Sequence, residues 1–408
     1  MSKTREKLYY GWVVVGVAFM VMFVNYGVRS TQTVLIKGFS EELDIGRAAA
    51  SLPFTVSVLV YAFLAPLTGR LVDRYGPRWV MVGGALISGV GLWMCSRVNS
   101  LFALVFFFGI VFGIGGNGIG LVPSNTSVAM WFRRRLGLAL GLATMGIGFG
   151  TMILPRLTGA VQSQLDWRAA FQFLGYVALA LIIPALFFLR GKRTPSDDEG
   201  EAASGAQPRD ADLPGGLTLK EAMRTSSFWL LFMGFVLIVI ALYGVMVHQV
   251  PYATDQGIAK GWAEWSIVVY GATSIAGRLF FGRLSDRTRE KKNALYPACV
   301  ILLVSISILI FVREVWSLMV FAAVFGFGFA AYGPVIPAVC AEVFGKANMG
   351  AIFGAVTTGG ALGGAAGPVV TGFIFDQSGN YIGAWILALA CVAVSTILFA
   401  RVRILWKE

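Results

Sequence analysis

The sequence has little charge for its length. Only 13% of its 408 residues are Asp, Glu, Lys or Arg, whereas 57% are hydrophobic and the mean hydropathy is +0.74. This composition excludes an ordinary soluble domain and is typical of a protein that crosses a membrane many times. Histidine is almost absent, because His248 is the one example, and a His/Cys metal cluster therefore cannot be assembled.

Cysteine is scarce as well. The four cysteines all lie within apolar runs, at Cys95, Cys299, Cys340 and Cys391. This placement favours buried hydrophobic side chains over a disulfide framework or a metal site. The sequence also lacks a recognisable set of nucleophile, base and orienting group, so we expect neither an enzyme nor a cofactor.

Long hydrophobic runs are what the sequence has in abundance. They predict an all-α membrane protein with twelve transmembrane helices in two six-helix halves. The basic N-terminus leads into a first run that is too long for a signal-peptide core, so we expect it to remain as a span. We place the spans at 11–36, 48–69, 79–97, 100–129, 137–163, 168–190, 227–254, 263–282, 294–312, 316–344, 350–375 and 381–402.

One stretch, 191–226, differs in composition from the rest of the chain. It contains KRTPSDDEGEAASGAQPRDADLPGG, which is rich in Asp, Glu, Gly, Ala, Pro and Ser and cannot build a core. We interpret 191–226 as a flexible linker with a short amphipathic helix near Leu217 to Met223. It separates an N-terminal half, 1–190, from a C-terminal half, 227–408.

The net charge of +12 would suggest nucleic-acid binding in a soluble protein. Here the basic residues lie at the ends of hydrophobic runs: 24 of the 33 fall on one side of the predicted membrane, six fall on the other, and three remain within spans. The positive-inside rule then places both termini and the linker on the cytoplasmic side of an inner membrane. We expect contact with membrane lipid, including at Arg133–Arg135, and no nucleic-acid partner.

An internal repeat relates the two halves. An ungapped offset of 213 residues superimposes Gly69, Arg70, Leu71, Asp73 and Arg74 on a matching set that begins at Gly282. The same offset aligns nine further glycines and prolines from the second span to the fifth, which is more than chance provides. Six spans per half give both halves the same orientation, with a central site expected between them. The glycines of spans five and eleven are also expected to form faces where helices pack closely or slide.

Arg278 carries the functional hypothesis. It lies in an otherwise apolar run within YGATSIAGRLFFGRLSDRTREKK, which starts at Tyr270. A charge at membrane depth costs from about 2.5 to more than 10 kcal/mol, so such an arginine usually faces a cavity, a partner or an anion. A guanidinium group suits a carboxylate because it donates two parallel hydrogen bonds. The alternative is a structural arginine that reaches the cytoplasmic surface, since we expect Gly282 to end the helix one turn later.

The GRLVDRYGPRW stretch from Gly69 to Trp79 resembles the signature of the major facilitator superfamily, and GRLSDRTREKK is its second copy. Three features are similar to the monocarboxylate transporter family and its oxalate/formate antiporter relatives: the GWVV stretch at Gly11, WFRRRLGLALGLATMGIGFG from Trp131, and Arg278. The resemblance implies that Arg278 anchors a carboxylate. It also implies a cytoplasmic gate with a charge pair in each half, formed by Gly69, Asp73, Arg74, Gly282, Asp286 and Arg287.

The sequence also departs from this family. Animal members carry an aspartate one turn before the arginine, where this chain has Ser274, so their Asp-Arg proton relay cannot be carried over. They carry a lysine in span one, where the nearest basic residue here is Arg29. The oxalate exchangers use a basic residue in span eleven, and its absence here favours a substrate with one carboxylate.

Other polar residues within the spans are candidates for lining a cavity, although each could instead form a helix-to-helix hydrogen bond. His248 is the candidate for proton coupling because its unperturbed pKa is near neutral, and the alternative is a hydrogen-bonded histidine at a helix end. The substrate-binding candidates are Arg278, Ser274, Tyr332, Asn117, Arg29, Gln32 and Tyr270.

These residues predict a secondary active transporter of small monocarboxylates such as lactate or pyruvate, monomeric and coupled to a proton. Carboxylate exchange of the oxalate/formate type is the first alternative, because exchange also balances the charge that crosses the membrane. Drug efflux is disfavoured because no acidic residue lies clearly within a span. A membrane sensor that does not transport is the alternative from another class, and it is disfavoured because the linker is the longest cytoplasmic segment.

Overall fold

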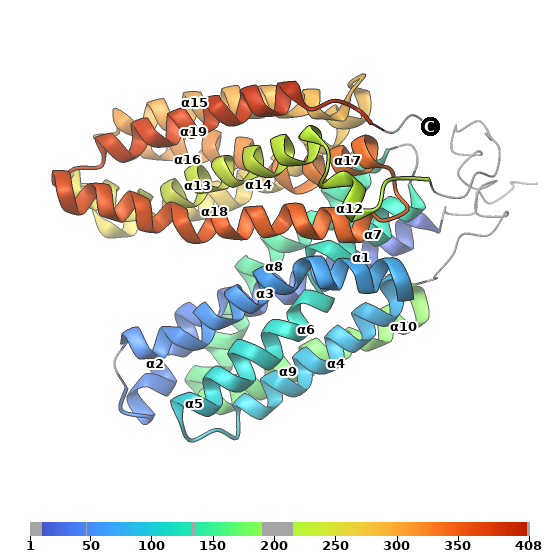
Figure 1. Ribbon diagram of the computed structural model, residues 1–408. Coiled ribbons are helices and arrows are strands. Elements are labelled where there is room, and N and C mark those ends of the chain that lie inside the picture. Colours follow the sequence, from blue (N-terminus) through green and yellow to red (C-terminus); the bar gives the residue numbers. More distant parts are fainter. Residues whose placement is uncertain (1–9, 46, 133–134, 190–214, 406–408) are drawn as a thin grey trace, which may run out of the picture. The chain divides into compact units, whose positions relative to one another are not determined.

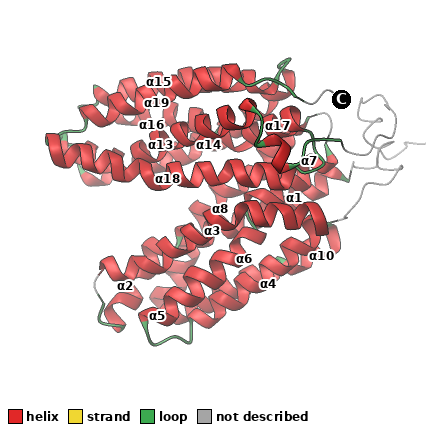
Figure 2. Ribbon diagram, viewed as in Figure 1, coloured by secondary structure: helices red, strands yellow, loops and turns green. Residues whose placement is uncertain are grey.

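The structure is a computed structural model that describes residues 10–45, 47–132, 135–189 and 215–405. Helices make up nearly all of this part of the chain, as Figure 2 shows, and the all-α prediction is confirmed. The chain divides into two compact units, Met1–Gly215 and Gly216–Glu408. Their boundary falls inside the stretch that the sequence predicts to be a linker, most of which lies outside the described residues.

Unit 1 is a bundle of long helices, some of which are interrupted (Figure 1). Its fourth span changes from α-helix to π-helix and back, and then breaks at Ile119 and Gly120. The elements are α1 Gly11–Ser30, α2 Gln32–Glu42, α3 Arg47–Tyr75, α4 Pro77–Cys95, α5 Leu101–Leu104, the π-helix η1 Val105–Phe112, α6 Gly113–Gly118, α7 Leu121–Trp131, α8 Leu136–Gln164, α9 Trp167–Ala180 and α10 Ile182–Phe188.

Unit 2 has the same kind of bundle, preceded by one short helix. That helix, α12, lies where the sequence predicts a short helix in the linker. The elements are α12 Leu219–Ala222, α13 Ser226–Asp255, α14 Lys260–Arg287, the 3₁₀-helix η2 Lys291–Ala294, α15 Leu295–Ile310, α16 Val315–Phe329, α17 Tyr332–Phe344, α18 Met349–Ser378 and α19 Ile382–Arg401.

Eleven spans in the described part of the chain are long and apolar enough to cross a membrane, one fewer than the twelve predicted. The segment that does not qualify is α14, which corresponds to the predicted span 263–282. It is a continuous helix of 28 residues, but four glycines and several charged side chains, Arg278 among them, lower its hydropathy. The helix most relevant to the proposed site is therefore also the least apolar.

Glycine contacts repeat with the same offset of 213 residues as the sequence. A Cβ atom on Gly150 of α8 would collide with the carbonyl oxygen of Phe23 on α1. In unit 2, a Cβ atom on Gly363 of α18 would lie 2.5 Å from the carbonyl oxygen of Val236 on α13. These glycines let the paired helices approach at backbone distance. The same offset relates the close approach of Gly113 to Ser57 and Val60 to that of Gly326 to Tyr270 and Thr273.

Two predicted helix ends are wrong. The sequence places the ends of the second and eighth spans at Gly69 and Gly282, but α3 continues to Tyr75 and α14 continues to Arg287. A glycine inside a helix costs only about 1 kcal/mol relative to alanine, which packing readily offsets. In α3 the turn is made instead by Gly76, whose φ of 82° falls in the region that favours glycine. Arg278 therefore lies more than two turns before the end of α14.

The N-terminal edge of unit 2 is tied to the connection between α17 and α18. Gly216 pairs with Gly345 in an isolated β-bridge, and the Leu217 backbone N–H donates to the carbonyl oxygen of Phe344 (2.9 Å). The Asn348 amide donates to the carbonyl oxygen of Leu217 (3.2 Å). These bonds satisfy carbonyl groups that the end of a helix leaves without partners.

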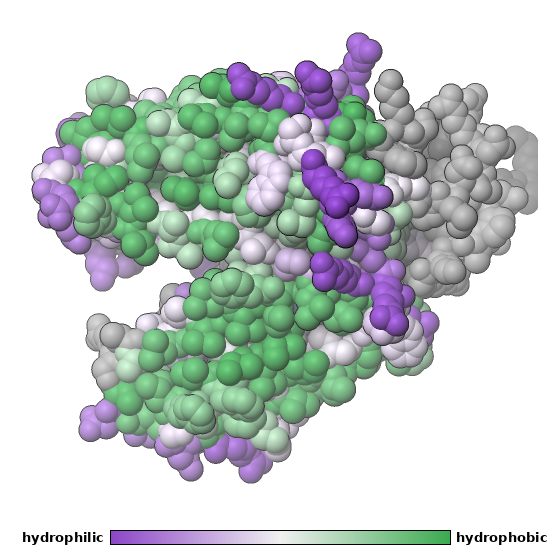
Figure 3. Space-filling model, viewed as in Figure 1, coloured by the Kyte–Doolittle hydropathy of each residue, from purple (hydrophilic) through white to green (hydrophobic). Residues whose placement is uncertain are grey.

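The surface has the pattern of a membrane protein. Within each unit, hydrophobic side chains cover the flanks of the helices and hydrophilic side chains gather at the helix ends (Figure 3). Large apolar side chains such as Phe63 and Val369 are about 70% exposed on these flanks. In water such a surface would cause aggregation, whereas in a bilayer it contacts lipid chains.

Candidate functional site

Arg278 is buried in the middle of α14. Its side chain is 5% exposed, and its Nη1 atom donates to the hydroxyl oxygen of Ser274, one turn earlier, at 2.9 Å. The Ser274 hydroxyl in turn donates to the carbonyl oxygen of Gly271 (2.8 Å). The neighbouring Gly277 packs so close to Phe327 of α16 that a larger side chain would collide with its carbonyl oxygen. This contact fixes the helix that carries the arginine.

Tyr270 shares α14 with Arg278 and Ser274. Its ring packs against Phe325 and Phe329 of α16, with centroid distances of 5.8 and 5.4 Å. Its hydroxyl lies 3.6 Å from the sulfur of Met246 on α13. The sequence candidates Arg278, Ser274 and Tyr270 thus lie along two turns of one helix.

Tyr332 begins α17 in the same unit. Its hydroxyl pairs with the sulfur of Cys299 on α15, at 3.3 Å, and the residue is 6% exposed. The sequence did not suggest Cys299 as a hydrogen-bond partner of Tyr332. A tyrosine hydroxyl can both donate and accept, so this contact occupies only part of its hydrogen-bonding capacity.

Unit 1 has a partly buried cation of its own. The guanidinium group of Arg29, on α1, lies 4.4 Å from the ring centroid of Tyr61 and 5.6 Å from that of Phe112. A Cβ atom on Gly116 would lie 3.1 Å from both Arg29 Nη2 and Asn25 Oδ1, so the two side chains converge on this glycine. Contact with aromatic faces stabilises a cation that is removed from water.

Asn25 and Tyr61 lie beside Arg29 but are not among the substrate-binding candidates selected from the sequence. Asn25 is fully buried, and its side-chain amide makes no hydrogen bond within the described part of the chain. The Tyr61 hydroxyl accepts from the backbone N–H of Leu121 (3.1 Å), where the fourth span breaks. The signal in the sequence was that Asn25 precedes Arg29 by one helical turn, which places both on one face.

Asn117 and Gln32, the other two substrate-binding candidates of unit 1, are not among the residues seen to contact Arg29. Asn117, in α6, is 3% exposed, and its amide donates to the carbonyl oxygen of Gly113 in the same helix (3.3 Å). Gln32 is exposed at the first position of α2. Asn117 is therefore buried and bonded, whereas Gln32 is exposed.

His248 joins three elements of unit 2. Its Nε2 lies 3.0 Å from the carbonyl oxygen of Pro368 on α18, and its Nδ1 lies 3.3 Å from the hydroxyl of Tyr381, just before α19. A carbonyl oxygen only accepts hydrogen bonds, so the proton resides on Nε2, and Nδ1 accepts from the tyrosine. Nδ1 is thus the atom that would take up a proton.

The predicted gate residues lie at the ends of α3 and α14. Asp286 forms an ion pair with Lys291 (3.7 Å), a partner that the sequence did not suggest for it. The Arg74 guanidinium lies 5.2 Å from the ring centroid of Tyr75. In unit 2, the five-residue step from Asp286 to Lys291 crosses the helix end, and the charge pair fastens the following turn onto it.

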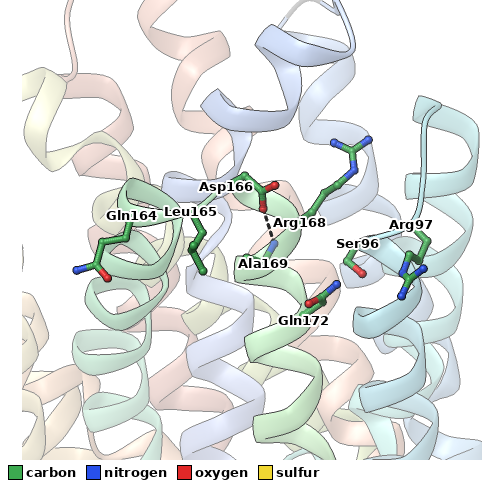
Figure 4. Close-up of a pocket in the computed structure, with 8 residues that line it drawn as sticks. All are labelled: Ser96, Arg97, Gln164, Leu165, Asp166, Arg168, Ala169 and Gln172. Carbon is green, nitrogen blue, oxygen red and sulfur yellow. Dashed lines mark hydrogen bonds between the residues drawn. The ribbon is translucent and has the colours of Figure 1, made fainter.

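A cavity of about 740 Å³ opens where α8 ends and α9 begins, and Figure 4 shows its lining with Arg97 and Arg168 on either side of Ser96. Arg168 is fully engaged: it pairs with Glu42, donates to Val98 O and Asn99 Oδ1, and stacks on Trp167. Hydrogen bonds from Trp167 and Arg168 hold the pKa of Glu42 below its usual range. We interpret this cluster as a clamp that joins α2, α9 and the connection after α4.

The charged groups at these positions are mainly cationic. No group of His, Cys, Asp and Glu suited to a metal occurs in the part of the chain that the structure describes. Unit 2 contains the buried guanidinium group of Arg278 beside a hydroxyl, and unit 1 contains the partly buried one of Arg29 beside an amide and aromatic rings. Arg278, Ser274, Tyr270, Tyr332 and His248 belong to unit 2, whereas Arg29, Gln32 and Asn117 belong to unit 1.

Comparison with known proteins identifies relatives over the whole chain. The chain is 26% identical to Monocarboxylate transporter 12 of Rattus norvegicus over 419 residues, which cover 97% of this chain and 86% of the relative. It is 25% identical to Monocarboxylate transporter 11 of Homo sapiens, with 93% and 80% covered.

A solved structure shares the fold. The crystal structure of the Major Facilitator Superfamily transporter FucP, in the outward conformation, matches with a TM-score of 0.73 at 16% identity and covers 97% of this chain and 99% of its own. The model of the Major Facilitator Superfamily matches residues 18–312 and 249–406. The chain therefore belongs to the Major Facilitator Superfamily and is a multi-pass membrane transporter rather than an enzyme.

Proposed function

We propose that this transporter carries small monocarboxylates, such as lactate or pyruvate, together with a proton, by alternating access across a cell inner membrane. The observation that carries the proposal is the burial of Arg278 at mid-helix, where it donates a hydrogen bond to Ser274. A guanidinium group in an apolar helix bundle costs free energy unless it contacts an anion, a polar partner or a water-filled cavity. A carboxylate satisfies it with two charge-assisted hydrogen bonds.

The neighbours of Arg278 suit a small substrate. Ser274 offers a hydroxyl, and Tyr270 offers an aromatic wall. In unit 1, Arg29, Asn117 and Gln32 are the proposed polar contacts, and the partly buried Arg29 supplies the second cation. The relatives named as monocarboxylate transporters support the same class of substrate.

Proton coupling follows from the charge of the substrate. An anion that enters a cell against a negative interior costs about 2.3 kcal/mol per 100 mV unless its charge is balanced. His248 is the proposed carrier, since its Nδ1 can take up a proton and then donate to Tyr381, which accepts in place of donating. Both termini and the linker are proposed to be cytoplasmic, and the protein is proposed to act as a monomer.

The gate residues are proposed to close the cytoplasmic side of each unit. Gly69, Asp73 and Arg74 in α3 correspond through the repeat to Gly282, Asp286 and Arg287 in α14. In unit 2, the ion pair of Asp286 with Lys291 would hold the helix end in place while that side is closed.

Transport in proteoliposomes tests the coupling. We expect labelled lactate to accumulate when the outside is more acidic than the inside, and a protonophore to abolish accumulation. Carboxylate exchange predicts the opposite pattern, in which uptake needs internal carboxylate and ignores the pH gradient. Uptake of that kind would replace symport by exchange.

Arg278 variants test the anchor. Arg278→Lys keeps the charge but loses the paired hydrogen bonds, and Arg278→Ala loses both, so we expect lactate affinity to fall about tenfold or more in each. The control is Arg156→Lys, at an exposed position of α8. Lactate binding retained by both Arg278 variants in folded protein would refute the assignment.

A further inference from the structure

A second hollow lies at the end of unit 2, away from Arg278. It has a volume of about 960 Å³ and is formed by the start of α13, the connection between α14 and α15, and the end of α19. Hydrophilic side chains gather at this end of the unit (Figure 3). The lining residues are Ser226, Leu230, Arg289, Glu290, Lys292, Ala400, Arg401, Val402, Arg403 and Ile404.

Positive charge dominates this hollow. Its lining includes three arginines and one lysine but a single acidic residue, Glu290. Lys292 neutralises Glu290 at 3.0 Å and also donates to carbonyl oxygens at the end of α19. Arg289, Arg401 and Arg403 have no side-chain hydrogen bond or ion pair within the described residues, and their charge is therefore left uncompensated.

The backbone around the arginines is held in place. The Ser227 hydroxyl donates to the carbonyl oxygen of Arg403 (3.0 Å) and accepts from its N–H (3.1 Å). Two residues on, the Leu405 N–H donates to the carbonyl oxygen of Val343 on α17 (3.2 Å). The segment after α19 is thus pinned across the start of α13, and Arg401 and Arg403 project from a fixed frame.

The start of α13 adds to the positive potential. Ser226, the first residue of this 30-residue helix, lines the hollow. The Thr225 side chain caps one backbone N–H, that of Phe228. The positive end of the helix dipole therefore faces the same space as the arginines.

Apolar surface flanks the hollow. Trp229 and Met233 on α13 are 45% and 47% exposed, and Val394 and Ile397 on α19 are 45% and 54% exposed. Both helices run from the hollow along the part of the unit that would lie in the membrane. A ligand that combines a phosphate group with acyl chains matches both the charge and these flanks.

We propose that this hollow binds the phosphate group of an anionic phospholipid, with Arg289, Arg401 and Arg403 as its ligands. The lipid belongs to the leaflet on the side where α19 ends, which is the cytoplasmic leaflet in the proposed orientation. A soluble phosphate ester presents the same group without acyl chains. The site is independent of what the transporter carries.

Native mass spectrometry of the delipidated full chain tests the site. The probes are phosphatidylglycerol and phosphatidylcholine with identical acyl chains. Each basic residue near a membrane surface contributes about fivefold to the binding of acidic lipid. In a variant that combines Arg289→Gln, Arg401→Gln and Arg403→Gln, we expect phosphatidylglycerol affinity to fall about 100-fold at low salt, with little change for phosphatidylcholine.

The control removes three charges elsewhere in the same unit. Lys220→Gln, Arg224→Gln and Arg283→Gln change exposed residues that do not line the hollow, and we expect a loss within about threefold. If both triple variants lost the same amount of phosphatidylglycerol affinity, the loss would be due to general surface charge, and the proposed site would be refuted. Displacement of phosphatidylglycerol by millimolar sn-glycerol 3-phosphate would overturn the lipid as the source of the phosphate.

The integrity of the fold is checked in the same samples. Lipid-free thermal unfolding of the triple variant should match that of the parent chain, because the three replaced side chains are exposed and form no hydrogen bond or ion pair within the described residues. If the triple variant does not fold, Arg401→Gln alone serves, with an expected fivefold loss of phosphatidylglycerol binding. An unchanged affinity in that single variant would contradict the proposal.

Discussion

At the scale of single residues, Asn25 is unusual because its buried side-chain amide lacks hydrogen-bond partners among the described residues. Its side chain is fully buried, and neither atom of its amide makes a hydrogen bond in the described part of the chain. Leaving a buried polar group unpaired costs about 1–3 kcal/mol. Asn25 also converges with Arg29 on Gly116. An unpaired amide that destabilises the resting protein and lies beside the cation of Arg29 is well placed to form a hydrogen bond with a substrate during transport.

Asn25→Leu separates these two roles. The variant keeps the size of the side chain but removes its polar atoms, so we expect the melting temperature to rise by a few degrees and lactate transport to fall at least tenfold. Asn117→Leu is the control, because the Asn117 amide already donates to Gly113 and its loss should not stabilise the fold. Thermal unfolding and proteoliposome uptake provide the readouts. A drop in both stability and transport for Asn25→Leu would make the residue structural.

Part of the site could be predicted residue by residue. Arg278 is visible in the sequence because one charge interrupts an apolar run, and the structure places it buried beside Ser274. The stacking of Arg29 on Tyr61 and Phe112 could not be predicted, since it needs side chains from separate segments in the right rotation. The hydrogen bond between Tyr332 and Cys299 could not be predicted either, because a cysteine in an apolar run is expected to act as a buried hydrophobic side chain.

At the scale of helices, glycines decide which pairs can touch at their backbones. Gly363 and Gly364 are neighbours on α18 with opposite surroundings. A Cβ atom on Gly363 would lie 2.5 Å from the carbonyl oxygen of Val236, whereas one on Gly364 would meet only the ring of Tyr243 at 3.7 Å. The first position lies at the contact with α13, and the second has room for a methyl group.

Alanine at these two positions should have opposite effects. Gly363→Ala must push α13 and α18 apart, so we expect a loss of stability of about 1–3 kcal/mol. Gly364→Ala should be neutral or should stabilise the helix by up to about 1 kcal/mol, because alanine has the higher helix propensity. Thermal unfolding in detergent measures both. Equal melting temperatures for the two variants would show that the helices of this unit are not in tight backbone contact.

Helix contacts were more predictable than helix ends. The offset of 213 residues, read from glycines, also relates the contact partners Phe23 and Val236, which are different residues at equivalent positions. The ends predicted at Gly69 and Gly282 failed because tertiary packing outweighs the weak preference of glycine against helix. The predicted span 263–282 is a continuous helix, α14, but its hydropathy falls below that of the other spans because it carries the polar residues of the proposed site.

At the scale of the whole molecule, the two units repeat the same helix contacts but carry different polar residues. The repeat places Tyr61 of unit 1 at the position of Ser274 in unit 2, and Ala65 at the position of Arg278. The cation of unit 2, Arg278, therefore lies on α14, the second long helix of its half. In unit 1 the cation is Arg29 on the first helix, α1, and it packs on the ring of Tyr61 on α3. The backbone contacts between helices are kept while the polar groups differ. This separation predicts that packing and recognition respond to different sets of substitutions.

The asymmetry at these paired positions suggests how the molecule arose and how it can be altered. Two copies of one six-helix segment begin with identical residues, so substitutions at a few positions are enough to give the proposed recognition residues of the two halves different chemistry. Laboratory evolution can follow the same route. Libraries limited to positions 61, 65, 274 and 278 would sample new cargo specificities while leaving the glycine crossings intact.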